Sequence, residues 1–310
     1  MFDLAILGGG AAGASAAIYA ARRGLSIALF EHAEMGGIIN TTPTVENYLG
    51  FPSASGRELG QKFAEHVRVY SEVKVLQEEV TGIQKKNGTF ALKTDSNSTH
   101  EAKTVIFATG AAPRQLGVPG EKEFSGKGVS YCATCDAPLF KGKRVAVVGG
   151  GDSGLTAALL LADLKCEVFL IHHRKNLKAE DALVDRARGR GNVKFLLNKN
   201  VTEIKGGKFL EKLVLQDAET KKSEELEVKG LFVYIGHAPA SELAKKLGCK
   251  IDEHGFIEVN TRLETTVPGV YAAGDVRKGS IGQLIASAAD GAIAALSAAE
   301  HVHGKPLKGW

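Results

Sequence analysis

At 310 residues the chain is longer than one ordinary domain, which predicts two domains. Its 39 basic and 35 acidic residues are spread along the sequence and leave a net charge of only +4, so no nucleic-acid partner is expected. The most apolar long run, near residues 155–162, ends at Asp163 and is too short for a membrane span, so no membrane partner is expected.

The first residues and the cysteines indicate a compartment. Met1 to Asp3 lead into the apolar stretch 4–7 without a basic leader or a small-residue cleavage site, so we expect no signal peptide and a cytoplasmic location. Four cysteines do not make a disulfide scaffold in a chain of this length, and in a reducing compartment a Cys-x-x-Cys pair is typical of catalysis or metal binding. Cys166 and Cys249 stand alone, and we expect both to be buried small apolar residues.

The chain opens with a strand, a glycine-rich turn, an alanine-rich helix, a second strand and an acidic residue. These are expected at residues 2–7, 8–13, 14–23, 25–30 and Glu31. The glycines of the turn are Gly8, Gly10 and Gly13. This order is typical of a dinucleotide-binding fold, in which the glycines let the backbone approach a pyrophosphate and the acid takes the ribose hydroxyls. The alternative is a tight turn without a ligand.

Residues 36–52 form a turn-rich polar loop, and a loop of this length usually contacts a ligand or a partner. The next elements are expected to be one helix and three strands, at 57–70, 73–84, 89–94 and 104–108. Thr109 and Gly110 follow the last strand, where the chain would return to the cofactor before it leaves the domain.

Two cysteines separated by two small residues lie in the stretch Tyr131-Cys132-Ala133-Thr134-Cys135-Asp136. This spacing lets both sulfurs meet within one turn of a helix start, so the pair can cycle between dithiol and disulfide with little backbone movement. The pair lies between the first glycine motif and a second one at 149–154. The sequence therefore places a redox pair beside two potential electron carriers.

The strand, glycine turn, helix and strand of the N-terminus recur after Lys143. The second set of glycines is Gly149, Gly151 and Gly154. Where the first copy has an acid, this copy has a histidine and then basic residues: His172, His173, Arg174, Lys175 and Lys178. A basic cluster suits a ribose 2′-phosphate better than a free hydroxyl, which predicts NADPH in preference to NADH. The alternative is a solvated helix start that is basic by chance.

Strand-like runs between residues 192 and 235 would form a small sheet that completes the second domain. Further elements are expected to be a helix, two strands and an alanine-rich helix, at 243–247, 256–259, 270–273 and 284–301. Asp275 follows the last strand and is placed to hold cofactor hydroxyls or an ordered water over a pyrophosphate. The final helix would aim its positive end at a flavin ring.

Taken together, the two glycine motifs and the cysteine motif resemble those of the low-molecular-weight thioredoxin reductases. The resemblance covers nearly the whole chain and also rests on Glu46-Asn47, Ala108-Thr109-Gly110 and Gly274-Asp275. It implies an α/β fold with two dinucleotide-binding, Rossmann-like, three-layer domains, the second inserted in the first.

The resemblance also implies where the two domains lie in the sequence. Residues 1–112 and 243–310 would bind FAD, and residues 113–242 would bind NAD(P) and carry the redox-active cysteines. In that family the inserted domain swivels, so that the cysteine pair faces the flavin and the outside in turn. Residues 113–114 and 237–241 would be the two hinge strands.

The same resemblance implies roles for the redox residues and names the partners. Cys135 would meet the flavin C4a, Cys132 would be the exchanging thiol, and Asp136 would move the proton that one sulfur loses and the other gains. The implied enzyme is a thioredoxin-disulfide reductase that uses NADPH. Its implied partner is thioredoxin or a similar small redox protein, and a homodimer formed through the FAD domain is expected.

The implied cofactors are FAD and NADPH, and no metal is expected. The residues expected to contact FAD are Gly8, Gly10, Gly13, Glu31, Asn47, Thr109, Gly110, Asp275 and Gln283. The residues expected to contact NADPH are Gly149, Gly151, Gly154, His173, Arg174 and Lys178.

The chain departs from the family in four places. His173 and Lys178 stand where the family has arginines, which should weaken contacts to a 2′-phosphate. Residues 155–158 lack the usual acids, Gly154 stands where alanine is common, and Gly282 replaces an arginine near the flavin. Three of the four departures lie on the electron-donor side.

The departures leave alternatives open. The same dithiol chemistry would also work with NADH or a reduced ferredoxin-like protein as donor, or in a thiol oxidase that passes electrons to oxygen. From another class, the cysteines would be half of a zinc site in a nonenzymatic nucleotide sensor, but the two further ligands are not evident in the sequence.

Overall fold

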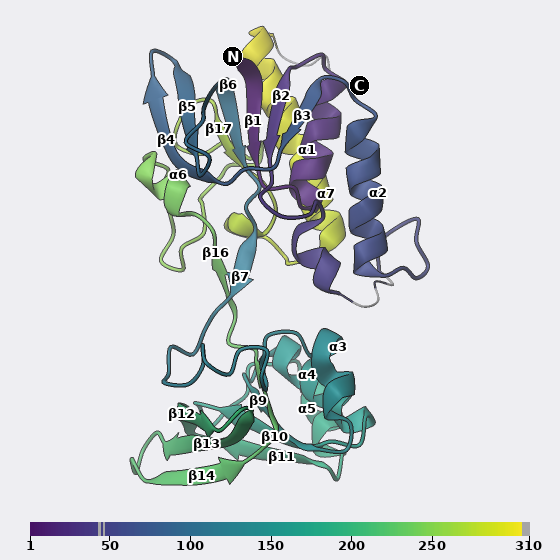
Figure 1. The fold of residues 1–310 in the computed structure, drawn as a ribbon, viewed down its shortest axis with the longest axis vertical. Helices are drawn as coiled ribbons and strands as arrows, with labels where there is room; N and C mark the ends of the chain where they lie inside the picture. Colours follow the sequence, from purple (N-terminus) through teal and green to yellow (C-terminus); the bar gives the residue numbers. More distant parts are fainter. Residues whose placement is uncertain (43–44, 46, 306–310) are drawn as a thin grey trace. The chain divides into compact units, whose positions relative to one another are not determined.

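The computed structural model of the protein describes residues 1–42, 45 and 47–305, without the side chain of Cys135. The chain divides into two compact units, residues 1–112 with 238–310 (unit 1) and residues 113–237 (unit 2) (Figure 1). The second change of unit falls after His237, whereas the resemblance implied a boundary after residue 242. In the described part of the chain, no helix has the length and apolar character needed to cross a membrane.

Unit 1 is built on a seven-stranded sheet with the order β3-β2-β1-β6-β5-β4, in which β17 also pairs with β6. Its strands are β1 (Phe2–Leu7), β2 (Ile27–Phe30), β3 (Val73–Leu76), β4 (Val80–Lys86), β5 (Thr89–Thr94), β6 (Thr99–Phe107) and β17 (Val270–Ala272). The strands β1, β2, β3, β6 and β17 pair in parallel, whereas β4 and β5 add an antiparallel edge. The parallel part is apolar on both faces because both faces are covered.

The two faces of this sheet belong to different hydrophobic cores. Leu4 and Ile6 of β1 lie in one core, whereas the alternate residues Ala5 and Leu7 lie in the other. The helices of the first core are α1 (Ala11–Ala21), α2 (Gly56–Arg68) and α7 (Leu284–His303), which Figure 1 shows together on one side of the sheet. The second core includes Ala244 of α6 (Glu242–Lys246). Two short helices, η1 (Gly37–Thr41) and η3 (Gly274–Val276), lie in the loops.

Two of the expected strands differ in the structure. The run 73–84 was predicted as one strand, but it forms β3 and β4, because β3 pairs in parallel with β2 whereas β4 pairs antiparallel with β5. The chain must turn between these two partners. At 256–259 there is no regular strand, and Ile257 makes only isolated bridges, to Ile251 and Arg277.

Unit 2 contains a parallel sheet with the order β11-β10-β9-β15-β8 and a three-stranded antiparallel sheet with the order β12-β13-β14. The parallel strands are β8 (Val129–Ser130), β9 (Arg144–Val148), β10 (Glu167–His172), β11 (Val193–Leu197) and β15 (Gly230–Val233). The antiparallel strands are β12 (Lys199–Gly206), β13 (Leu210–Asp217) and β14 (Ser223–Glu227). The expectation that the runs between 192 and 235 form one small sheet is wrong in part, because β11 and β15 pair in parallel with β10 and β9. The helices are α3 (Ala133–Asp136), η2 (Ala137–Phe140), α4 (Asp152–Asp163) and α5 (Asp181–Arg188).

The parallel sheet of unit 2 lies between its helices and its antiparallel sheet. Val145 and Val147 of β9 pack in a core with α4, while Ala146 and Val148 pack in a core with β12 and β13. These are three layers: helices, parallel sheet and small sheet (Figure 1). The short helix α3, which carries the cysteine motif, belongs to the helical layer and packs with α4 through Ala133.

The chain passes between the units through β7 (Ala111–Pro113) and β16 (His237–Pro239). These two strands pair with each other as a separate two-stranded sheet. The Arg114 amide continues the pairing by donating to the Gly236 carbonyl at 2.9 Å.

Candidate active site

The first glycine motif connects β1 to α1 in a turn that has no room for side chains. Gly8 has φ +105°, and a Cβ there would lie 2.3 Å from the Ala108 carbonyl oxygen. A Cβ on Gly13 would lie 1.8 Å from the Gly8 carbonyl oxygen. Gly10 is the N-cap residue of α1 and makes no side-chain cap, which leaves backbone N–H groups at the helix start for an anion.

Glu31, the acid after β2, folds back onto this turn. One carboxylate oxygen accepts the Gly9 amide at 2.8 Å and the other accepts the Ala33 amide at 2.9 Å. The side chain is only 10% exposed. A ribose diol at this position would therefore meet a carboxylate that two amides already hold in place.

Other residues expected near FAD are brought together from distant parts of unit 1. Asn47 donates to the Gln283 side chain at 3.1 Å, and Thr109 donates to the Ala240 carbonyl at 2.7 Å. Gly110 has φ +66° and accepts the Ala240 amide at 3.0 Å. Glu46, which the resemblance also used, lies outside the described residues.

Asp275 lies in η3 and accepts hydrogen bonds from Ser280 at 2.7 Å and Ser287 at 3.4 Å. Its neighbour Gly274 donates its amide to Asp290, a buried carboxylate of α7 that the sequence analysis missed. The available signal was a single acidic residue in an otherwise apolar stretch of an alanine-rich helix.

The cysteine motif forms a short turn in unit 2. The Cys132 amide donates to the Ser130 hydroxyl at 3.0 Å, and the Cys132 sulfur lies 3.3 Å from the Thr134 hydroxyl. Cys132 is disulfide-bonded. Asp136 donates its amide to the Cys132 carbonyl at 3.1 Å. Cys135 lies within α3, and its side chain is outside the described part of the structure.

The two other cysteines are buried and free. Cys166 is 0% exposed and Cys249 is 5% exposed. Burial raises the pKa of both thiols, which keeps them protonated and unreactive. The prediction that both are buried small residues is confirmed.

Two tyrosines to which the sequence analysis gave no role lie against the cysteine turn. The Tyr234 hydroxyl accepts the Ala133 amide at 2.7 Å. The Tyr131 hydroxyl donates to Glu121 at 2.8 Å, and this carboxylate, 2% exposed, also accepts the amides of Leu116 and Gly117. Tyr234 and Ala133 are far apart in the sequence, and Glu121 belongs to no recognised motif, so spacing alone could not predict either contact.

The second glycine motif repeats the tight contacts of the first. Gly149 has φ +135°, and a Cβ there would lie 2.0 Å from the Tyr234 carbonyl oxygen. A Cβ on Gly154 would lie 2.2 Å from the Gly149 carbonyl oxygen. Gly151 is the N-cap residue of α4 and provides no side-chain cap. The helix start therefore offers the same kind of backbone donors as α1 does.

His172 lies directly beneath this turn. A Cβ on Gly150 would come 2.6 Å from the imidazole ring, which is 5% exposed. Burial, assisted by the charge of His173, lowers the pKa of His172, so the ring is neutral at pH 7. Its Nε2 has no hydrogen-bond partner among the described residues.

The basic residues after β10 are only partly available to a phosphate. Arg174 donates through Nε to His173 at 3.1 Å, and Lys175 forms an ion pair with Glu219 at 2.6 Å. The Lys178 amide donates to the Gly150 carbonyl at 2.7 Å, which folds this loop back onto the glycine turn. The loop thus places Lys178 next to the second motif.

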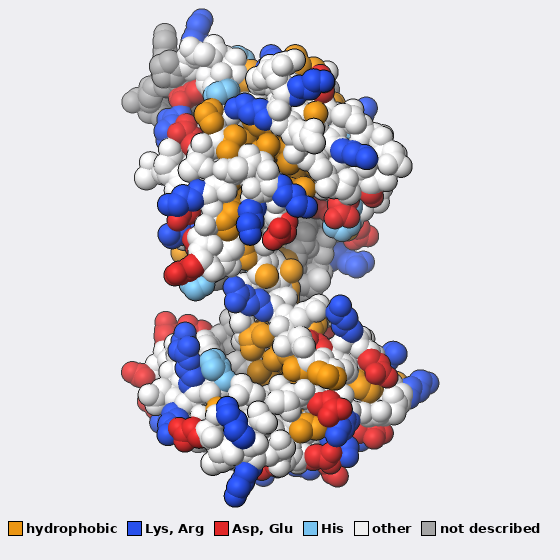
Figure 2. Space-filling model, turned by 90° about the vertical axis from the view of Figure 1, so that its left-hand side faces the viewer, with side chains coloured by type: hydrophobic (Ala, Val, Ile, Leu, Met, Phe, Trp, Pro, Cys, Tyr) orange, Lys and Arg blue, Asp and Glu red, His pale blue; other side chains and the backbone are white. Residues whose placement is uncertain are grey.

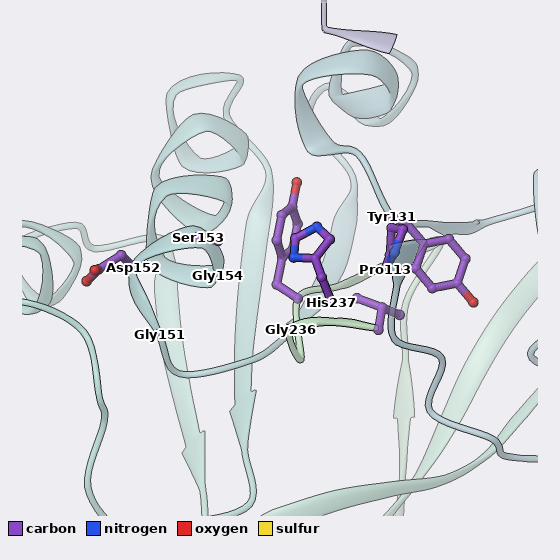
Figure 3. A pocket seen from close by; sticks show the side chains of 10 residues that line it. Pro113, Tyr131, Gly151, Asp152, Ser153, Gly154, Gly236 and His237 are labelled. Atoms are coloured by element: carbon purple, nitrogen blue, oxygen red, sulfur yellow. The ribbon is translucent and has the colours of Figure 1, made fainter. Parts of the chain in front are cut away.

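A cavity of about 180 Å³ opens at the second glycine motif. It is lined by Pro113, Tyr131, Gly151, Asp152, Ser153, Gly154, Val233, Tyr234, Gly236 and His237. Figure 3 shows His237 between Asp152 on one side and Tyr131 on the other, with the Asp152 carboxylate and the Tyr131 hydroxyl both pointing away from it. The Asp152 carboxylate instead accepts the Glu180 amide at 2.8 Å.

The surface charges are mixed. On the face in Figure 2, basic and acidic side chains are interspersed on each unit. In the small sheet of unit 2, Lys205 and Lys212 both pair with Glu225. Among the described residues, no group of three or more His, Cys, Asp or Glu side chains converges as a metal site would require.

The fold and these two glycine sites define a nucleotide-dependent disulfide oxidoreductase. The sequence model of the pyridine nucleotide-disulphide oxidoreductase family matches residues 2–291, and the chain belongs to that family. The family implies FAD and a pyridine nucleotide as cofactors.

Comparisons with individual proteins point to one type within the family. The chain is 40% identical to a thioredoxin reductase of Bacillus subtilis, over 97% of this chain and 95% of that protein. The crystal structure of Lactococcus lactis thioredoxin reductase is 35% identical, with a TM-score of 0.87 over 98% of this chain and all of that chain. The thioredoxin reductase of T. acidophilum is 44% identical, with a TM-score of 0.83 over 96% and 98% of the two chains.

The protein is therefore an enzyme of the thioredoxin reductase type, a flavin disulfide oxidoreductase. The predicted resemblance and the predicted α/β fold with two Rossmann-like domains are confirmed.

Proposed function

We propose that the enzyme passes electrons from NADPH, through FAD and the Cys132–Cys135 pair, to the disulfide of thioredoxin or a similar small redox protein. The observation that carries this proposal is that the disulfide-bonded Cys132 lies in a turn packed on α4, the helix that starts at the second glycine motif. The family and the named relatives support the same reading.

The residues of unit 1 fit FAD. The turn leaves no room for a Cβ at Gly8 or Gly13, the start of α1 has no side-chain cap, and Glu31 is held beside the turn. We assign the pyrophosphate to the turn and the ribose to Glu31, with Asp275 beside them. When bound, FAD supplies the chemistry that thiols lack, because it accepts a hydride equivalent and returns an electron pair to a disulfide.

The cysteines then carry out thiol–disulfide exchange. The Cys132 thiolate attacks one sulfur of the partner disulfide, which forms a mixed disulfide and releases the first partner thiolate. The Cys135 thiolate attacks the Cys132 sulfur, which restores the internal disulfide and releases the second partner thiolate. Asp136, one turn from Cys132, would hold the proton that the sulfurs exchange. Each cycle thus moves two electrons outward.

We assign NADPH to the cavity of unit 2. A pyrophosphate would meet the uncapped start of α4, and Arg174 and Lys178 follow β10 where a 2′-phosphate is read in this fold. We assign the other glycine-motif residues, Gly149, Gly151 and Gly154, to the same nucleotide.

A second electron donor is a candidate because two basic side chains that would bind the 2′-phosphate already have partners. Lys175 is already paired with Glu219, and the Arg174 Nε is already bound to His173. An enzyme that binds the 2′-phosphate weakly would use NADH almost as well as NADPH, or would take electrons from a reduced ferredoxin-like protein.

Anaerobic titration of the purified protein tests the donor. With NADPH as donor, the visible absorption band of the flavin should bleach at lower concentrations of NADPH than of NADH, on the order of tenfold lower. Bleaching by neither nucleotide, together with turnover of thioredoxin when reduced ferredoxin is supplied, would support the second donor. A protein that holds no FAD would refute the whole proposal.

The setting of the reaction follows from the proposal. A dithiol that reduces thioredoxin needs a reducing compartment, so we propose the cytoplasm. We also propose a homodimer, which sedimentation equilibrium of the FAD-loaded protein tests.

A further inference from the structure

Tyr234 joins the nucleotide cavity to the cysteine turn within unit 2. It directly follows β15, and its amide donates to the Val148 carbonyl at the end of β9 at 2.7 Å. Its carbonyl oxygen lies against Gly149, and its side chain lines the cavity. From this position the hydroxyl accepts the Ala133 amide. One residue thus contacts both the glycine motif and the redox motif.

The Ala133 amide depends on this contact. Ala133 is 1% exposed, so water does not reach its backbone freely, and a buried N–H group without a partner is costly. The preceding amide, that of Cys132, donates to the Ser130 hydroxyl. The two hydrogen bonds, at 3.0 Å to Ser130 and 2.7 Å to Tyr234, therefore fix the backbone on both sides of the Cys132 α-carbon.

Fixing this backbone has a consequence for the sulfur. The Thr134 hydroxyl lies 3.3 Å from the Cys132 sulfur, and Thr134 follows Ala133 directly. We propose that Tyr234 is a positioning residue for the exchanging thiol: by holding the Ala133 amide, it keeps the Thr134 hydroxyl aimed at the Cys132 sulfur. In this structure that sulfur is disulfide-bonded. When the pair is reduced, the same hydroxyl would donate to the Cys132 thiolate, which stabilises the charged form and so favours the reactive state of Cys132.

The hydroxyl of Tyr234 stays protonated while it does this. Burial raises the pKa of Tyr234, and the negative charge of Asp136 adds to the effect. Two other titratable groups on the cavity have their own partners: Tyr131 is bound to Glu121, and the Asp152 carboxylate accepts the Glu180 amide. His237 also lines the cavity, with Asp152 and Tyr131 on either side of it (Figure 3).

This inference deepens the proposed function, because it assumes that Cys132 is the exchanging thiol. Its test needs neither NADPH nor thioredoxin. The FAD-loaded protein is reduced with dithiothreitol, the reductant is removed without oxygen, and alkylation of Cys132 by iodoacetamide is followed by peptide mass spectrometry from pH 5 to pH 10. Failure of the donor titration would leave this measurement intact.

In Tyr234→Phe the ring remains and only the hydroxyl is lost. We expect the pH midpoint of Cys132 alkylation to rise by about half a unit, so that alkylation at pH 7 slows about threefold. The matched control is Tyr271→Phe, which also removes a buried tyrosine hydroxyl, but one that donates to the Ser297 carbonyl at 3.2 Å in unit 1, and its alkylation midpoint should equal that of the unmodified enzyme. Equal midpoints in all three proteins, with FAD bound in each, would overturn the proposal.

A second variant tests the route through Thr134. Thr134 is exposed, so Thr134→Val should fold normally and should raise the alkylation midpoint by a similar amount. In the double variant the two changes should not add, because both remove the same contact to the sulfur. An unchanged midpoint in Thr134→Val, or full additivity in the double variant, would contradict the inference. The Thr134→Val result holds even if Tyr234→Phe fails to fold.

Discussion

The Arg277 guanidinium holds the Asp290 carboxylate with two hydrogen bonds, from Nε at 2.6 Å and from Nη2 at 2.8 Å. Asp290 also accepts the Gly274 amide at 3.0 Å. The two charged side chains are only 19% and 8% exposed. Through these contacts, α7 fixes the start of η3 and with it Asp275, the residue that we assign to the flavin nucleotide.

Asp290→Ala should therefore destabilise unit 1 strongly. The substitution leaves the Arg277 charge and the Gly274 amide without their partner in a site shielded from water, which costs about 3–5 kcal/mol. Chemical denaturation of the FAD-loaded protein measures this loss. As a control, Glu167→Gln weakens exposed ion pairs with Lys194 and Arg144 and should cost less than about 1 kcal/mol. Equal losses in both variants would contradict the role given to Asp290.

Gly13→Ala should abolish or strongly weaken FAD binding. A Cβ at this position would lie 1.8 Å from the Gly8 carbonyl oxygen, so the turn that we assign to the pyrophosphate has to move. We expect FAD affinity to fall at least about tenfold. Absorbance of the protein-bound flavin after gel filtration provides the measurement. Gly82→Ala is the matched control in the same unit, because its nearest neighbour would be 3.8 Å away, and it should keep its flavin.

His172 should make the stability of unit 2 depend on pH. Because burial lowers its pKa below the ordinary value of 6.5, the unfolded chain binds the proton more readily than the folded chain does. The contribution of the neutral ring is complete above pH 6.5 and is lost as the pH falls through the lower pKa of the folded state. The midpoint temperature of unfolding should therefore decrease as the pH is lowered from 7.5 to 5.

His172→Gln, which cannot titrate, should show a weaker fall over the same range. His254→Gln serves as the control, because the side chain of His254 is 65% exposed, and it should keep the full pH dependence. Thermal melts of the FAD-loaded protein across this range decide the point. If His172→Gln and the unmodified protein lose stability in parallel, the histidine is not the cause.

Serine at either redox cysteine should separate flavin binding from disulfide reduction. Cys132→Ser and Cys135→Ser leave unit 1 untouched, so FAD should remain bound at full stoichiometry. Neither variant can complete the exchange that needs both thiols, and thioredoxin reduction should fall to background. A thiol-reporter assay, run beside the flavin spectrum, measures both. Activity that survives in the Cys132→Ser variant would show that another thiol carries the exchange.

Glu219→Gln should improve the use of NADPH. The substitution releases Lys175 from its 2.6 Å ion pair and removes a negative charge from the loop that we assign to the 2′-phosphate. The KM for NADPH should fall about threefold, while the KM for NADH stays the same. Glu224→Gln, which breaks the pair with Lys199 in the small sheet, is the control and should change neither KM. An equal fall in the KM for both nucleotides would show that the 2′-phosphate does not bind at this loop.

The residues that the sequence analysis missed share a physical cause. Tyr234 reaches Ala133 because β15 pairs with β8, the strand that leads into the cysteine turn, and these two segments are far apart in the chain. Asp290 reaches Gly274 only because α7 packs on the sheet beside η3. The split of the run 73–84 into two strands has the same origin, since the local pattern is strand-like throughout and only the choice of pairing partners breaks it.

The sequence by itself determined the two nucleotide folds, the redox motif and the family, because glycine turns, helical periodicity and the Cys-x-x-Cys spacing are local properties of the chain. Only the tertiary structure decided that Glu31 is held by two amides, that His172 is buried beneath Gly150, and that Tyr234 supports the cysteine turn. These features depend on which strands pair and which side chains lose water, and such contacts between distant segments leave no periodic signal in the sequence.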